Sequence, residues 1–182
     1  MVSLFTTVFA ALALAGSSVS ATPLARDTCA PNAQGSGVSI VSAQFGSLEW
    51  GDHNATPAVG DVLGFSSARG LAATDFHVQQ SGQFPASFII KDVDNNSLAV
   101  TAQGSHLAFT TASDSGDQVD QIFDISCQSC AGDTTPGKAA GSSCTFSPHG
   151  HSDQCVTLGS KDVLLSLTGC TGSSNQLFNI VF

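Results

Sequence analysis

Two histidines and an aspartate lie close together in the segment Pro148–Asp153 of this 182-residue chain, and they form its densest group of chemically active side chains. If this segment were a strand, His149 and His151 would face the same side and could share a metal ion. In a loop, the same two imidazoles would be solvated. We favour the loop interpretation and predict no metal at these histidines.

Pairs of carboxylates are the second group that could carry chemistry. Asp92 lies close to Asp94, and Asp114 lies close to Asp117, but both pairs occur in turn-like stretches where aspartate is common for backbone reasons. They therefore do not indicate a glycosidase pair. The sequence also lacks a Gly-x-Ser-x-Gly nucleophile elbow and a phosphate-binding glycine loop. We predict a non-catalytic protein with no cofactor.

The N-terminal residues indicate export from the cell. The apolar run Leu4–Ala15 is followed by small residues, with Val19 and Ala21 at the minus-three and minus-one positions of a cleavage site. This pattern predicts a signal peptide over residues 1–21, too short to span a membrane, and an N-terminal extension over 22–36. A buried N-terminal strand is the alternative. In a secreted eukaryotic protein, Asn54 and Asn95 would be N-glycosylation acceptors.

The chain has an even number of cysteines, which favours disulfides over metal binding behind an export signal. They are Cys29, Cys127, Cys130, Cys144, Cys155 and Cys170. A disulfide between Cys155 and Cys170 is predicted because the intervening turn folds two β-rich runs back together. The other pairings stay open. The spacing of Cys127 and Cys130 also leaves a zinc site, completed by the two histidines, as an alternative.

Charge and composition exclude several classes of partner. The chain has 14 acidic and 5 basic residues and a formal net charge of -9, so clustered positive charge for nucleic acid or anionic lipid is missing. We expect a secreted, extracellular monomer that contacts neither nucleic acid nor membrane. Short β-rich runs alternate with Gly, Ser, Asp and Asn turns, which favours an all-β domain.

A short motif around a phenylalanine recurs three times, in Ala73–Val78, Asp120–Ile125 and Asn175–Ile180. Three such units are what a β-trefoil requires, because only together do they close the barrel and bury a common core. We place the repeats at about 37–84, 85–126 and 145–182, with a Cys-rich insertion at about 127–144. An unrelated β-sandwich with chance matches is the alternative.

The repeated motif residues have structural roles in this prediction. Phe76, Phe123 and Phe178 should pack the barrel interior. Gln121 and Gln176 should first hydrogen-bond backbone in the adjacent turns, because buried amides must find partners.

The segment Cys155–Phe182 resembles one repeat of the ricin-type β-trefoil lectins, which runs Cys-Val-Asp, hairpin, Cys, polar loop, Asn-Gln-x-Trp. The match consists of Cys155-Val156, Cys170 and Asn175-Gln176, with Phe178 at the tryptophan position. The resemblance implies a ricin B-like, disulfide-stabilised β-trefoil over 37–182 that recognises a glycan or glycoprotein surface.

In that family an aspartate after Cys-Val, an aromatic residue near the second cysteine, and the Asn-Gln pair hold the sugar. Asn175 and Gln176 are present here, whereas Thr157 and Thr168 occupy the aspartate and aromatic positions. In the second repeat we place Ala99 at the aspartate position. The resemblance therefore implies that the usual galactose site is eroded and that lactose binds negligibly. A secreted protein-interaction module or hydrolase inhibitor is the alternative function.

Overall fold

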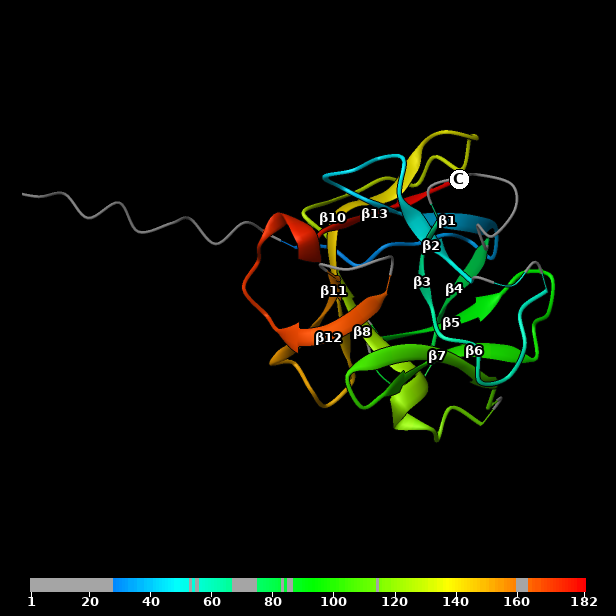
Figure 1. Ribbon diagram of the computed structural model, residues 1–182. Coiled ribbons are helices and arrows are strands. Elements are labelled where there is room, and N and C mark those ends of the chain that lie inside the picture. Colours follow the sequence, from blue (N-terminus) through cyan, green and yellow to red (C-terminus); the bar gives the residue numbers. More distant parts are fainter. Residues whose placement is uncertain are drawn as a thin grey trace, which may run out of the picture.

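Three units of four strands follow one another along the chain (Figure 1). The structure, a computed structural model, describes residues 28–52, 54, 56–66, 75–82, 84, 87–113, 115–159 and 164–182. The predicted signal peptide, the first part of the extension and the residues Ala73 and Thr74 lie outside this described part. In the described part, no helix is long and apolar enough to cross a membrane.

The strands of the three units have the following bounds. The first unit contains β1 (Gly37–Ser42), β2 (Glu49–Gly51), β3 (Gly64–Ser66) and β4 (Phe76–Gln80). The second contains β5 (Ser87–Asp92), β6 (Leu98–Gln103), β7 (His106–Thr111) and β8 (Ile122–Ser126). The third contains β10 (Ala139–Pro148), β11 (Gln154–Leu158), β12 (Leu165–Gly169) and β13 (Phe178–Val181). Short 3₁₀ turns, η1 (Val119–Gln121) and η2 (Ser174–Gln176), precede β8 and β13.

The first and fourth strands of the units form a closed barrel. Each fourth strand pairs antiparallel with the first strand of its own unit and with the first strand of the next unit, in the ring β1–β4–β5–β8–β10–β13–β1. The second and third strands form the hairpins β2–β3, β6–β7 and β11–β12. Closure removes the exposed sheet edges of the barrel. The predicted β-trefoil is confirmed, and the alternative β-sandwich is wrong.

The three repeated phenylalanines occupy equivalent positions. Where each fourth strand meets the next unit, Phe76 pairs with Asp92, Phe123 with Pro148 and Phe178 with Ser42. All three rings have no exposed surface. One large apolar side chain from each unit therefore enters the shared core, as the recurrence of the motif predicts.

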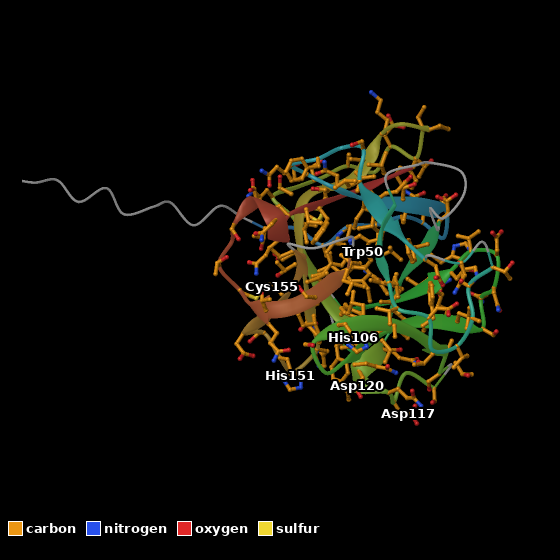
Figure 2. The ribbon with its side chains drawn as sticks, viewed as in Figure 1. Trp50, His106, Asp117, Asp120, His151 and Cys155 are labelled. Atoms are coloured by element: carbon orange, nitrogen blue, oxygen red, sulfur yellow. A yellow bond between two sulfur atoms is a disulfide. The ribbon has the colours of Figure 1, made fainter. Side chains whose placement is uncertain are left out.

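Trp50 fills the middle of this core (Figure 2). Its ring centroid lies 5.0 Å from that of Phe146, 5.5 Å from that of Phe178 and 6.1 Å from that of Phe76. Strand register places Val100 and Val156 at the equivalent positions of the other two hairpins. A single indole thus occupies the centre of the core that the three units share.

The boundary predicted for the third unit was too late. Strand β10 begins at Ala139 rather than at 145, and the segment assigned to the insertion contains a further strand, β9 (Ser129–Cys130), which pairs with β10. A Cβ on Gly141 would lie 2.6 Å from the Cys127 Sγ atom and 2.8 Å from the Cys144 Sγ atom. Gly141 thus leaves room for these sulfur atoms, and the small residues 139–141 at the start of the strand have the composition of a loop.

All six cysteines form disulfides. Cys155 bonds to Cys170, as the sequence predicts, and the two pairings that the sequence left open are Cys29–Cys130 and Cys127–Cys144. The zinc alternative is therefore wrong, because the thiolates it needs are consumed in covalent bonds.

Candidate ligand-binding site

The Asn-Gln pair of the third unit makes several hydrogen bonds within the protein. Gln176 is 1% exposed. Its Oε1 atom accepts hydrogen bonds from the Thr171 backbone N–H at 2.8 Å and from the Gly172 N–H at 3.2 Å, and its Nε2 atom donates to the Gly169 carbonyl at 2.9 Å. These bonds hold the turn before β13 against the end of β12. Gln176 thus makes the backbone hydrogen bonds in the adjacent turn that the sequence predicts.

Two threonines lie at the positions where the resemblance predicts an aspartate and an aromatic residue, and their side chains contact each other. The hydroxyls of Thr157 and Thr168 lie 2.7 Å apart, and Gln176 Nε2 lies 3.0 Å and 3.2 Å from them. Thr157 is 6% exposed. The polar groups at this position satisfy one another, so few remain for hydroxyls of a sugar. Asn175 is half-buried and accepts from the Ser173 hydroxyl at 2.6 Å.

The second unit repeats this closed network. The Thr101 and Thr110 hydroxyls lie 2.6 Å apart, and Gln121 Nε2 lies 2.8 Å from the Thr110 hydroxyl. Gln121 Oε1 accepts from the Ser113 backbone N–H at 2.9 Å. Ala99 is therefore not at the aspartate position. Strand register places Thr101 there, opposite Ala108, in the way that Thr157 lies opposite Ser166.

These networks predict unequal costs for neighbouring substitutions. Gln176→Ala should lower the free energy of unfolding by about 2–3 kcal/mol, because buried groups of the turn lose their partner. Asn175→Ala should cost about 0.5 kcal/mol or less, since the side chain retains contact with water. Urea unfolding of both variants measures the difference. Equal costs would contradict the structural role of Gln176.

A pocket of about 440 Å³ opens at another place, where β5, β8 and β10 meet. Phe84 precedes β5, Ser87 begins it, Asp124 lies in β8, and His149 follows β10. The segment 28–30 forms another wall. The described residues that line the pocket are Thr28, Cys29, Ala30, Phe84, Ser87, Asp124, Ile125, Ser126 and His149.

Two side chains of this pocket, Ser87 and His149, contact the carboxylate of Asp124. Its carboxylate accepts a hydrogen bond from the Ser87 hydroxyl, and its two oxygens lie 3.0 Å and 3.2 Å from His149 Nδ1. Because a carboxylate can only accept, Nδ1 carries the imidazole proton and donates it to this bond. Ser87 is 1% exposed, whereas the side chains of Asp124 and His149 are 41% and 26% exposed. The buried Ser87 and the partly buried His149 thus hold the carboxylate in place, while part of it remains accessible to solvent.

An aromatic ring completes the site. Phe84 is 39% exposed, and its ring stacks on that of His149 with centroids 4.2 Å apart and planes at 27°. The stacked pair presents apolar surface directly beside a carboxylate. This combination suits a ligand that has both C–H groups and hydroxyls.

The barrel has three equivalent corners, each at the place where the fourth strand of one unit meets the first strand of the next. The other two corners lack the Ser87–Asp124–His149 group, so the fold does not require it. The backbone N–H at the position of His149 donates to the carbonyl of the residue before the repeated phenylalanine, and the pairs are His149–Ile122, Val93–Asp75 and Ala43–Leu177. At one corner, Gly37 occupies the position of Ser87, and His77 occupies the position of Asp124. At the other, Ser143 donates its N–H to Asn179 Oδ1 at 2.9 Å. The serine–aspartate–histidine group occurs at one corner of three.

The sequence singled out His149 but not the residues that accompany it. His151 lies at the periphery (Figure 2) and is exposed, so the two histidines do not act together. In the described part of the chain, no group of three His, Cys, Asp or Glu side chains is placed to hold a metal ion. Phe84, Ser87 and Asp124 come from distant segments, and only the register of β5, β8 and β10 brings them to His149.

The remaining candidate residues have simpler environments. Asn54 and Asn95 are exposed, and Asn95 Oδ1 accepts from the Ser97 backbone N–H at 3.3 Å. Asp92 is buried, and loss of hydration raises the pKa of its carboxyl above the ordinary value. Asp94 is exposed, whereas Asp114 lies outside the described residues.

Comparison with known proteins identifies a shared fold. No protein-family model and no curated protein matches the chain. Among solved structures, it is similar to the designed threefold-symmetric protein ThreeFoil, with a TM-score of 0.59, 12% identity, and coverage of 80% of this chain and 98% of that one. The C-terminal domain of an earthworm lectin, a mutant in complex with 6'-sialyllactose, gives a TM-score of 0.55, 14% identity and coverage of 80% and 97%.

A toxin also contains this fold as one of its parts. A mosquitocidal holotoxin gives a TM-score of 0.62 at 12% identity, with coverage of 81% of this chain. The matched region spans only 17% of the holotoxin. At these identities, the similarity establishes the β-trefoil architecture and assigns no family.

Proposed function

We propose that this chain is a secreted, non-catalytic carbohydrate-binding protein whose ligand occupies the pocket formed by Phe84, Asp124 and His149. The observation that carries the proposal is the exposed Phe84 ring beside a carboxylate that Ser87 and His149 hold in position. An aromatic face covers the C–H side of a sugar ring, and a fixed carboxylate accepts hydrogen bonds from its hydroxyls.

The proposal places binding away from the Asn-Gln motif for a physical reason. Thr157 and Thr168 direct their hydroxyls at each other and at Gln176, and all three partners would have to separate before a sugar could bind there. The pocket needs no such rearrangement. Secretion is supported by the apolar N-terminal run and by the three disulfides, which persist in oxidising compartments.

Replacing Phe84 by alanine should weaken glycan binding about tenfold, since an aromatic contact contributes about 1–1.5 kcal/mol. A glycan microarray with the wild type selects the probes, and titration calorimetry with the strongest of them measures the loss. Phe45→Ala is the matched control, because Phe45 is also an exposed phenylalanine, at 46%, and lies in a different turn. Its affinity should equal that of the wild type.

Two results would argue against the proposal. Equal affinity of the Phe84→Ala and Phe45→Ala variants would show that glycans bind elsewhere. No glycan binding by the wild type, together with inhibition of an enzyme in a protease and glycosidase panel, would instead support a hydrolase inhibitor.

A further inference from the structure

The charges around the pocket determine which sugars it can accept. We infer that the site formed by Phe84, Asp124 and His149 selects glycans whose contacting sugar carries no negative charge, and disfavours sialylated, sulfated and uronic-acid sugars. This inference rests on the proposed function and names its ligand class.

The first observation is the sign of the charge in the pocket. Among the described residues that line the pocket there is one carboxylate, that of Asp124, and neither lysine nor arginine. The imidazole of His149 already directs its Nδ1 proton at this carboxylate. An anionic sugar would therefore bring a second negative charge close to Asp124, and none of the described lining residues is a lysine or arginine that could offset their repulsion.

The second observation is the capacity of Asp124 to accept further hydrogen bonds. A carboxylate offers about four acceptor positions. Ser87 and His149 occupy part of this capacity, and 41% of the side chain is exposed to solvent. The remaining positions suit two hydroxyls on neighbouring sugar carbons. Ser87 and His149 act as positioning residues, because they orient the carboxylate toward such donors.

The third observation concerns the rest of the surface. The chain has a formal net charge of -9, so its long-range field also repels anionic glycans. The pocket and the whole molecule thus act in the same direction. The earthworm lectin domain with the similar fold is in complex with a sialylated sugar, so the fold itself imposes no such selection.

Matched pairs of glycans test the inference. Each neutral probe on the microarray is printed beside its sialylated or sulfated derivative. At low salt, neutral probes that the wild type binds should be retained about tenfold more strongly than their anionic partners. High salt should reduce the difference, because exposed charges are screened.

Residues at an equivalent corner of the barrel suggest two substitutions for testing the inference. Asp124→Asn removes the negative charge and replaces one acceptor oxygen by an NH2 group of similar size, and Asn179 already occupies the equivalent position at another corner. His149→Ala places alanine where Ala43 lies at that same corner. We expect Asp124→Asn to weaken neutral probes about tenfold and to remove the discrimination against anionic ones. Phe45→Ala should preserve both affinity and discrimination.

The outcomes separate the inference from the proposed function. Anionic probes that bind the wild type as strongly as their neutral partners would overturn the inference while glycan binding stands. Unchanged affinity of Asp124→Asn, together with a loss in Phe84→Ala, would overturn it as well. If the wild type binds no probe of either kind, the proposed function fails and the inference fails with it.

Discussion

Replacing Trp50 by alanine should lower the free energy of unfolding by about 3–5 kcal/mol, the cost of removing a fully buried tryptophan. The indole has no exposed surface and contacts phenylalanines from the first and third units. Its removal would leave a cavity where the units meet, and the rigid barrel strands around it could collapse only partly. Urea unfolding, followed by far-ultraviolet circular dichroism, measures the change.

Trp50→Phe is the matched control for this experiment. The indole Nε1 atom has no hydrogen-bond partner among the described residues, so the contribution of this side chain comes from ring contacts. Phenylalanine keeps most of those contacts, and we expect a loss of about 1–2 kcal/mol. A loss below about 1 kcal/mol for Trp50→Ala would show that the ring does not fill the common core.

The fold was predictable because each of its three units has a large apolar residue at the equivalent position. A barrel built from three units needs an equivalent buried side chain in each, and Phe76, Phe123 and Phe178 recur with turn residues between them. Glutamine before the ring is explained by the same structure. Gln121 and Gln176 close the turns before β8 and β13 by binding backbone groups that would otherwise be unsatisfied.

The start of the third unit was not predictable from composition. Ala139, Ala140 and Gly141 have the residue types of a loop. This segment pairs with β13 and β9, and Gly141 leaves room for the Cys127–Cys144 disulfide, whose pairing the sequence could not determine. A strand packed against sulfur and an exposed linker can therefore have the same composition.

The candidate site was harder to predict than the fold. Asp124 belongs to the repeated motif Asp120–Ile125 and Ser87 has no distinctive neighbours in sequence, so neither residue was predicted to belong to a site. Their contact follows from the pairing of Ser87 with Asp124 across β5 and β8. The prediction that Ala99 lies at the aspartate position was wrong for a similar reason. Thr101, the residue at that position, is two residues further along the strand, so both side chains are on the same face and the hydrophobic pattern does not distinguish them.

Removing the Cys127–Cys144 disulfide by substituting both cysteines with alanine should lower the free energy of unfolding by about 4–5 kcal/mol. About 3 kcal/mol of this comes from releasing a closed loop in the unfolded chain, where the two residues are 17 apart. The remainder comes from the core. Cys127 and Cys144 have no exposed surface, so the missing sulfur atoms leave a cavity beside Gly141.

The Cys155–Cys170 disulfide provides the comparison that separates these two contributions. Its cysteines are 15 residues apart, so its loop contribution is also about 3 kcal/mol, but Cys170 is exposed. The Cys155→Ala, Cys170→Ala variant should therefore be more stable than the Cys127→Ala, Cys144→Ala variant by about 1–2 kcal/mol. Unfolding of both proteins in urea without reductant measures this difference. Equal losses would mean that burial of the Cys127–Cys144 sulfurs adds nothing to the free energy of unfolding.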